Sequence, residues 1–165
     1  MEATIIKAGR LSSLLYLYDM HTDYYHRVLD GISDGDTHNR LDTKANHISW
    51  IAGSLVQERF ELANALGKKL TSAAHEFFRD HKGIQDGLTY PSLDVYKRDW
   101  DTISPVLKEV LEETTDEQLD KPFPMPEMQM SYFDLIAFMT YREANCIGQI
   151  ALWRRLLGYE AMKYM

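Results

Sequence analysis

Cysteine is almost absent from this 165-residue chain, which contains a single one, Cys146. One cysteine excludes a disulfide within the chain and is typical of a protein in the reducing cytoplasm. Long apolar runs are also missing, because no stretch approaches the roughly 18 residues that a membrane-spanning helix needs. Residues 1–7 lack a basic region followed by an apolar stretch, so we expect no signal peptide. We therefore predict a cytoplasmic protein with no membrane partner.

An excess of positive charge is missing as well. The chain carries 25 acidic residues against 18 Lys and Arg, and its net charge is −7 at pH 7. Such a chain has no positive excess to displace the counterions of a phosphate backbone, so we expect no nucleic-acid partner. Hydrophobic residues make up 45% of the chain, an ordinary share for a globular protein. At this length we expect one domain, covering residues 1–165.

Four long segments carry the spacing of three and four residues between apolar side chains that marks one face of a helix. They run from Leu11 to Leu29, from about Thr43 to Leu66, from Ser92 to Thr114 and from Ser131 to Gly158. We expect a shorter helix over Thr71–Asp80 and an ordered connector over Gly83–Pro91 between the second and third segments. Ser131 and Asp134 have the spacing of a capping box at the start of the last helix. Together these features predict an all-α fold, an antiparallel four-helix bundle with a longer crossover between its second and third helices.

The last predicted helix carries the most specific pattern in the chain. It resembles the last bundle helix of the DinB/YfiT-like superfamily, which reads His-Glu-x-x-His-x-Gly-Gln and continues into a basic, Leu-rich end and a glycine. The residues that match are Glu143, Gly148, Gln149, Arg154, Arg155 and Gly158. The second helix resembles the superfamily motif Asn-x-x-x-Trp-Ile-x-Gly-His through Asn46, Trp50, Ile51 and Gly53. This resemblance covers most of the chain and implies the same four-helix bundle.

The superfamily often holds one divalent metal, such as zinc or nickel, on three histidines that converge from the second and the last helix. The resemblance places Ser54, Arg142 and Cys146 at those three positions. None of the six histidines follows His81, so no shift of the last helix restores an imidazole there. The permanently charged guanidinium of Arg142 also repels a divalent cation. We therefore predict no metal and no other cofactor at these positions.

Three side chains remain as weak catalytic candidates. His47 lies two turns before Ser54 and could serve as a general base or a lone ligand, although we favour a partly exposed histidine near a helix start. Cys146 lies one turn from Arg142 and could be a nucleophilic thiolate with a lowered pKa. We favour a buried cysteine that packs as a small apolar group, because no histidine base is near it in the sequence. Metal-free chemistry by Cys146 with Arg142 stays open as a third possibility.

Arg142 needs a carboxylate partner if it points into the bundle. The sequence predicts an inward stripe of Leu135, Met139, Arg142, Cys146, Gln149 and Trp153. Asp19 and Glu58 are the candidate partners, in either a structural ion pair, which we favour, or a pocket for an anionic small molecule. Gln149 is expected to hydrogen-bond across the bundle, and Gly148 to permit close helix approach.

Two functions compete at this stage. The replaced ligands favour a binding or interaction module that has lost metal catalysis. The alternative, which the resemblance implies, is metal-dependent hydrolysis or transfer of a low-molecular-weight thiol such as bacillithiol, mycothiol or glutathione through a variant site. The superfamily name refers to DNA damage, but nothing in the chain resembles a DNA-reading surface. We also expect a homodimer, as is common in the superfamily, because Tyr16 and Tyr24 fall off the apolar stripe of the first helix.

Overall fold

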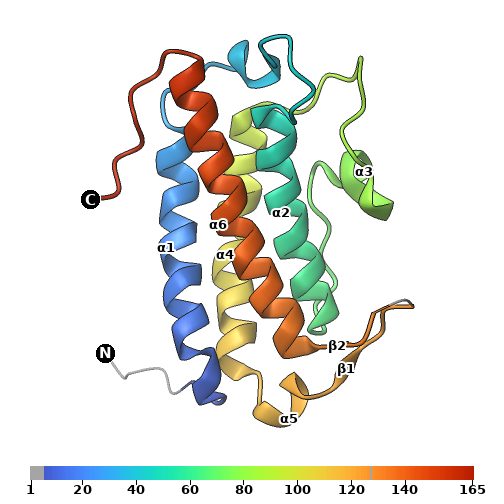
Figure 1. Ribbon diagram of the computed structural model, residues 1–165. Coiled ribbons are helices and arrows are strands. Elements are labelled where there is room, and N and C mark those ends of the chain that lie inside the picture. The colour runs from blue at the N-terminus through green and yellow to red at the C-terminus, as the bar shows by residue number, and fades with distance from the viewer. Residues whose placement is uncertain (1–5, 127) are drawn as a thin grey trace.

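Four long helices form a bundle in a computed structural model that describes residues 6–126 and 128–165 (Figure 1). They are α1 (Ser12–Leu29), α2 (Ile48–Ala65), α4 (Leu93–Glu113) and α6 (Tyr132–Leu156). The predicted all-α fold class and its four long helices are confirmed. The expectation of no signal peptide rests mainly on residues 1–5, which lie outside the described residues. Within the described residues, no helix combines the length and the apolar character that crossing a bilayer requires.

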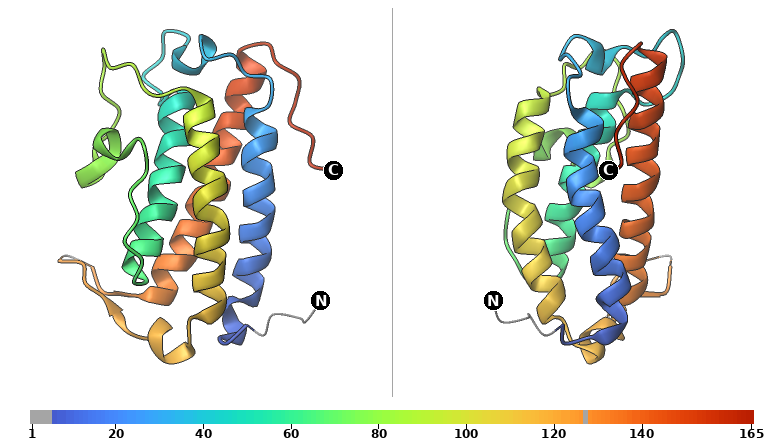
Figure 2. Two further views of the ribbon diagram at one scale, coloured as in Figure 1. Left: turned by 180° about the vertical axis from the view of Figure 1, so that it is seen from behind. Right: turned by 90° about the vertical axis from the view of Figure 1, so that its left-hand side faces the viewer.

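The crossover between the second and third long helices decides how the bundle is arranged. α1 and α6 run in one direction, and α2 and α4 run in the other (Figures 1 and 2). α2 packs against α4 and α6, and α1 packs against the same two helices. The crossover is confirmed, but it brings the chain back to the end where α2 began, so that α2 and α4 are parallel. Among the four packed pairs, α1 with α4 and α2 with α6 are therefore antiparallel, whereas α1 with α6 and α2 with α4 are parallel, so neighbouring helices are not antiparallel throughout as predicted (Figures 1 and 2).

Polar side chains cap the starts of three long helices. Ser131 and Asp134 form the predicted capping box at α6. At α2, His47 Nδ1 accepts a hydrogen bond from the backbone N–H of Trp50 at 3.1 Å. Ser92 precedes α4 as predicted, but its side chain makes no capping bond. The carboxylate of Asp34, from the loop after α1, instead accepts from the N–H of Leu93 at 3.1 Å.

The crossover segment carries a shorter helix than predicted. It contains α3 (His75–Phe78) and a 3₁₀ turn (Arg79–His81), and Thr71 does not cap it. Phe78 packs on α2 and α4 at Gly53, where an added Cβ would lie 2.5 Å from the Phe78 ring and 2.6 Å from the Tyr96 ring. Gly53, one of the residues that carry the superfamily resemblance, is therefore required for this close approach.

Short elements close the two ends of the bundle. A 3₁₀ turn (Gly9–Leu11) precedes α1, and another (Asp36–His38) follows it. α5 (Asp116–Leu119) connects α4 to a two-stranded antiparallel ribbon of β1 (Pro122–Phe123) and β2 (Met130–Ser131). In this ribbon Pro122 pairs with Ser131, and Phe123 pairs with Met130. The ribbon delivers the chain directly to the capping box of α6.

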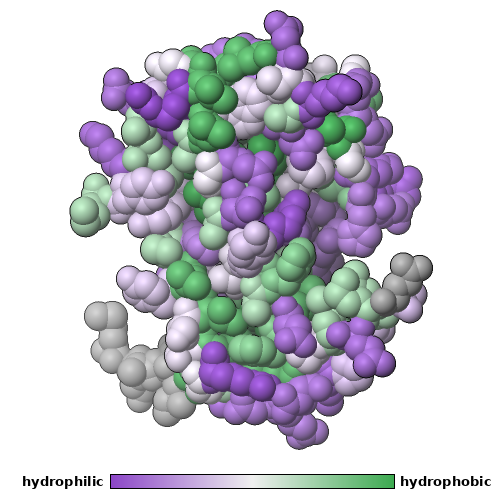
Figure 3. Space-filling view, in the orientation of Figure 1, coloured by the Kyte–Doolittle hydropathy of each residue, from purple (hydrophilic) through white to green (hydrophobic). Residues whose placement is uncertain are grey.

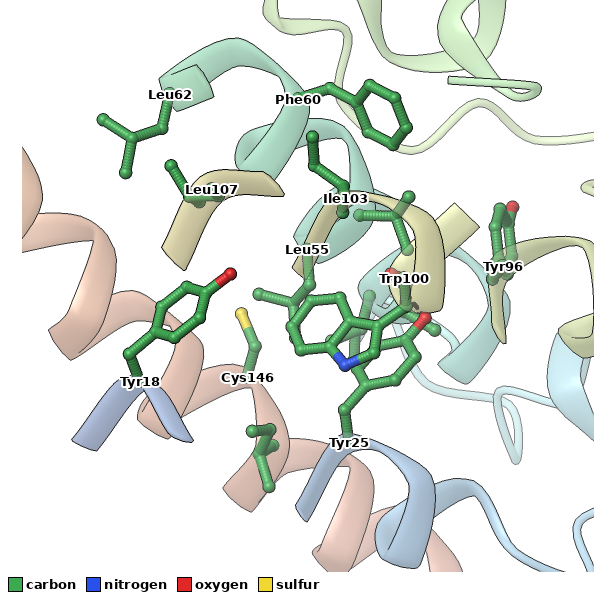
Figure 4. Packing of buried hydrophobic residues seen from close by; sticks show 14 of the residues in the cluster. Tyr18, Tyr25, Leu55, Phe60, Leu62, Tyr96, Trp100, Ile103, Leu107 and Cys146 are labelled. Atoms are coloured by element: carbon green, nitrogen blue, oxygen red, sulfur yellow. Dashed lines mark hydrogen bonds between the residues drawn. The ribbon is translucent and has the colours of Figure 1, made fainter. Parts of the chain in front are cut away.

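The core is filled by large side chains from all four long helices (Figure 4). The rings of Tyr25 and Trp100 stack with their centroids 4.0 Å apart. The indole N–H of Trp100 donates to the backbone carbonyl of Thr22 at 3.2 Å. Aromatic packing between α1 and α4 therefore comes with its polar groups satisfied, as burial requires.

Candidate functional site

Two of the three positions that the superfamily resemblance marks as metal ligands come into direct contact between α2 and α6. Arg142 Nη2 donates a hydrogen bond to Ser54 Oγ at 3.2 Å. Arg142 also forms an ion pair with Glu58, one helical turn beyond Ser54. The sequence offered Asp19 and Glu58 as candidate carboxylate partners of Arg142, and the partner is Glu58. The antiparallel run of α2 and α6 brings these side chains together from distant parts of the chain.

The Arg142–Glu58 pair is only partly open to solvent. The two side chains are 24% and 17% exposed. Burial raises the pKa of Glu58 to about 7, and the adjacent Arg142 guanidinium limits this rise. The pair therefore contains a carboxyl group that titrates near neutral pH, next to a permanently charged guanidinium.

The donor set at these positions does not fit a divalent metal. The Arg142 guanidinium is held between Ser54 and Glu58, and the Ser54 hydroxyl donates to the backbone carbonyl of Ile51 at 2.8 Å. Burial raises the pKa of the Cys146 thiol, which opposes the thiolate form that metals bind. Across residues 6–126 and 128–165, no group of three or more His, Cys, Asp or Glu side chains is arranged to hold a metal ion.

Cys146 is not placed as a nucleophile. Its side chain is buried, and Figure 4 shows the sulfur pointing into the core. The lowered pKa considered from the sequence is wrong, because desolvation outweighs the nearby guanidinium of Arg142. Cys146 packs as a small apolar side chain, the alternative that the sequence favoured.

His47 does not point toward Ser54. Its ring is used as the α2 cap and packs against the rings of His38 and Tyr90, with centroids 4.7 and 5.2 Å away. Burial, with the charges of His38 and Arg40 nearby, lowers the pKa of His47 to about 4. A role as general base or ligand in the Ser54 region is therefore wrong. The interpretation favoured from the sequence was a partly exposed histidine near a helix start. His47 does lie at the start of α2, but it is buried.

Asp19 lies outside the site, whereas Gln149 lines the open groove between α2 and α6. Asp19 forms an exposed ion pair with Lys108 of α4 at 2.7 Å. Gln149 is exposed and donates to Asn145 of its own helix at 2.6 Å, so the predicted bond across the bundle is wrong. Gly148 is also exposed, and an added Cβ there would meet nothing within 4 Å. It therefore permits no close approach inside the bundle.

One rotation of α6 explains these errors. The buried face of α6 is centred on Ile136, Thr140, Glu143, Ile147, Ile150 and Arg154. The predicted stripe is offset from this face by one residue, which is about 100° around the helix, on the flank that faces α2. Arg142 therefore bonds to Ser54 of α2 and Trp153 donates to the carbonyl of Asn46 just before α2, whereas Gln149 is exposed.

Glu143, which matched the superfamily motif but received no role from the sequence, anchors a buried polar network. Arg59 Nε donates to Glu143 Oε1 at 2.6 Å, and Arg59 Nη2 donates to Oε2 at 3.0 Å. His21 Nδ1 lies 3.2 Å from Oε2. Although burial opposes it, the Arg59 charge and the His21 contact hold the pKa of Glu143 below its usual value.

The guanidinium of Arg59 is fully surrounded. It lies between the rings of Tyr18 and Trp100, 3.9 and 3.6 Å from their centroids. Its Nη1 donates to Thr22 Oγ1 at 2.8 Å and to Ser104 Oγ at 2.7 Å. Arg59 therefore connects α2 to α1, α4 and α6, and its satisfied contacts indicate a structural role. The sequence analysis missed Arg59, and the one feature that could have revealed it is a charged residue in the apolar second helix.

An open groove between α2 and α6 includes Arg142 in its lining. Its volume is about 310 Å³. The residues that line it include Asn46, Trp50, Tyr141, Arg142, Asn145 and Gln149. The indole N–H of Trp50 is buried and has no acceptor within the described residues. The groove thus offers a guanidinium, side-chain amides and exposed aromatic surface.

The expected dimer face is partly covered by the chain itself. Tyr16 is 72% exposed, but the ring of Tyr24 packs edge-on against Tyr164 with centroids 5.4 Å apart. The C-terminal segment therefore covers part of the Tyr24 ring, and the homodimer through Tyr16 and Tyr24 stays a prediction.

Comparisons with known proteins agree with this architecture. No protein-family profile matches the chain, and no curated protein matches its sequence. The structure is similar to the crystal structure of a DinB-like protein, YjoA, from Bacillus subtilis, with a TM-score of 0.65 and 14% sequence identity. The match covers 92% of this chain and 96% of that chain. At this identity the likeness establishes the fold, which is DinB-like as the sequence motifs predicted.

Proposed function

We propose that this chain is a DinB-like bundle that has lost metal-dependent catalysis and acts as a binding module. The observation that supports the loss is the Arg142 guanidinium, held by Glu58 and Ser54 where the superfamily would hold a metal. A fixed positive charge occupies the region in which a divalent cation would need negative or neutral ligands.

The groove between α2 and α6 is the proposed ligand site. Its volume of about 310 Å³ lies at the lower end of the range for small-molecule sites. Arg142 supplies a positive charge, and the side-chain amides of Asn46 and Asn145 supply further hydrogen-bonding groups. Tyr141 offers an aromatic face at the rim. These groups fit a small molecule with an anionic end and a flat apolar body.

The loss of the metal site can be tested by restoring the three histidines. We expect untagged wild-type protein to carry no stoichiometric zinc or nickel by elemental mass spectrometry. The triple variant Ser54→His/Arg142→His/Cys146→His should acquire one. In the matched control Ser54→His/Cys146→His, Arg142 stays in place and should keep the metal out. A stoichiometric metal in the wild type would instead support the hydrolase or thiol-transferase alternative.

The groove can be tested with benzoate, which has an aromatic ring and one negative charge. We expect benzoate to shift the indole N–H resonance of Trp50 at millimolar concentration, and benzyl alcohol, which lacks the charge, to shift it less. Arg142→Gln should weaken the benzoate effect, whereas Arg155→Gln, an exposed arginine on the same helix, should not. A benzoate response that Arg142→Gln leaves unchanged would contradict the assignment of the anion to this groove.

A further inference from the structure

The two-stranded ribbon before α6 carries three methionines close together. Met125, Met128 and Met130 have the spacing Met-x-x-Met-x-Met. The ribbon projects from the lower end of the bundle (Figures 1 and 2). In Figure 3, pale green, moderately hydrophobic side chains gather at the lower right, where Figure 1 places this ribbon. Methionine usually fills gaps inside a core, so three of them on a projecting ribbon indicate another role.

The register of the ribbon determines which side chains share a face. Phe123 pairs with Met130, and at the base of the ribbon the N–H of Tyr132 donates to the carbonyl of Lys121 at 3.1 Å. Both contacts belong to one antiparallel register, in which opposite residues share a face and successive residues alternate. Phe123, Met130 and Tyr132 should therefore lie on one face. The rings of Phe123 and Tyr132 do meet edge-on, with centroids 5.4 Å apart.

The same alternation brings all three methionines to this face. Met128 lies two residues before Met130, so the two side chains point the same way. The strands end at Phe123 and Met130, and continuing their register by two residues on each side places Met125 opposite Met128. Directly opposite side chains have their Cβ atoms about 5 Å apart. The flexible methionine side chain can then bring the three sulfur atoms to one point.

The outer methionines are open to solvent. Met125 is 43% exposed and Met128 is 54% exposed, and Met130 is partly buried. Three of the five prolines of the chain, at positions 122, 124 and 126, lie in the same ribbon. Proline fixes its own φ angle, which limits the conformations that the ribbon can adopt. A ligand that gathers the three sulfur atoms therefore has less chain entropy to overcome.

We propose that Met125, Met128 and Met130 form a binding site for a soft monovalent metal cation, copper(I). The thioether of methionine is a neutral, polarisable sulfur ligand, and such ligands select copper(I) over harder divalent ions such as magnesium or calcium. Three thioethers on one face can surround a single ion without any change in the bundle. The site shares no residue with the α2–α6 groove and does not depend on a ligand there.

A protein contact is the other use that exposed methionines have. The residues that dominate such contacts are tryptophan, tyrosine and arginine. None of these occurs between Phe123 and Met130, where every apolar side chain other than proline is a methionine. This composition favours a sulfur site over a protein contact.

Other ligands for soft cations can be separated from this site. The single thiol, Cys146, is buried and can be removed by Cys146→Ala. Histidine is protonated below its ordinary pKa of about 6.5 and then binds no metal, whereas a thioether carries no proton to lose. Binding at the three methionines should therefore persist at pH 5, where binding at histidines is lost.

Silver(I) is the probe, because it has the charge and softness of copper(I) and is stable in air. Cys146→Ala protein labelled with ¹³C at the methionine methyl groups is titrated in chloride-free buffer, at pH 7 and at pH 5. We expect one equivalent to shift the methyl signals of Met125, Met128 and Met130 and to leave those of Met20 and Met165 in place. Copper(I) under anaerobic conditions should shift the same three signals, and magnesium(II) should shift none of them.

Leucine variants identify the ligands, because leucine keeps the volume and apolar character of methionine and removes the sulfur. Met125→Leu and Met128→Leu should each weaken silver binding by about tenfold or more, since each removes one of three ligands. The triple variant with Met130→Leu should abolish it. Met165→Leu, at an exposed methionine outside the ribbon, is the matched control and should bind as before. Unchanged urea unfolding midpoints in the single variants would exclude loss of folding as the cause.

Three results would overturn the proposal. Methyl signals of the ribbon that do not move with silver would leave it as a protein contact at most. Silver binding that survives the triple leucine variant would place the ion elsewhere. Binding that disappears at pH 5 would assign it to histidine.

Discussion

Arg59 and Glu143 form a bidentate ion pair in the centre of the bundle, with their side chains 1% and 7% exposed. The pair joins α2 to α6, and the remaining Arg59 donors reach Thr22 and Ser104. Taking two charges out of water costs free energy that only complete hydrogen bonding offsets. The network is therefore sensitive to the loss of either partner.

We predict that Glu143→Leu or Arg59→Met alone will lower the free energy of unfolding by about 3–5 kcal/mol, because each leaves a buried charge unpaired. The double variant should lose much less than the sum of the two. Urea denaturation of the four proteins gives the coupling directly. Additive losses would show that the two side chains do not act as a pair.

A matched pair of glycines should give opposite effects. Gly53→Ala places a methyl group 2.5 Å from the Phe78 ring and 2.6 Å from the Tyr96 ring, and should destabilise the fold by about 1–3 kcal/mol. Gly148→Ala meets nothing and should stabilise α6 by about 0.5–1 kcal/mol. Thermal or urea unfolding of the two variants at the same protein concentration compares them. Equal losses at both sites would contradict the packing of Phe78 on α2.

Acid should destabilise the protein through His47. Its pKa is about 4 in the folded chain against 6.5 in the unfolded chain, so the unfolded chain binds the proton more tightly. This contribution to stability is present above pH 6.5 and is lost as the pH falls to 4, with a total of about 3 kcal/mol at 1.36 kcal/mol per pKa unit. His47→Asn keeps a capping acceptor and should remove this loss. An unchanged pH profile in the variant would contradict the burial of His47.

Acid should stabilise the protein through Glu58, the opposite of its effect through His47. Its pKa of about 7 in the folded chain exceeds the ordinary 4.5, so protonation favours the folded state. Stability from this group therefore rises as the pH falls from 7 to 4.5, and partly offsets the loss from His47. In a His47→Asn background the free energy of unfolding should increase over this range. Adding Glu58→Gln should flatten it, and a slope that persists would place the titrating group elsewhere.

Cys146 should be chemically inert in the folded protein. Its side chain is buried, and burial raises the pKa of its thiol. We expect labelling by a thiol reagent at pH 7 to be slow and to accelerate in urea in step with unfolding. Complete labelling within seconds under native conditions would restore the nucleophile hypothesis.

The sequence by itself determined the four long helices and the cap of the last one. Periodic apolar residues located all four long helices, and the spacing of Ser131 and Asp134 identified the start of α6. These features depend on residues a few positions apart, so local rules suffice for them. The Arg142–Glu58 pair was also accessible, because a charge placed on a predicted inner face needs a partner of opposite sign.

Tertiary structure alone decided which way α6 faces and which charges meet. α6 is apolar on both its inner and its outer face, so periodicity leaves its rotation undetermined, and packing against α1 and α2 fixes it. The sequence predicted an inward Gln149 and gave Glu143 no role, whereas this rotation places Glu143 in the core and Gln149 in solvent. The contact between Arg59 and Glu143 joins residues 84 positions apart. No local spacing can predict such a pair, because it exists only after four helices have assembled around it.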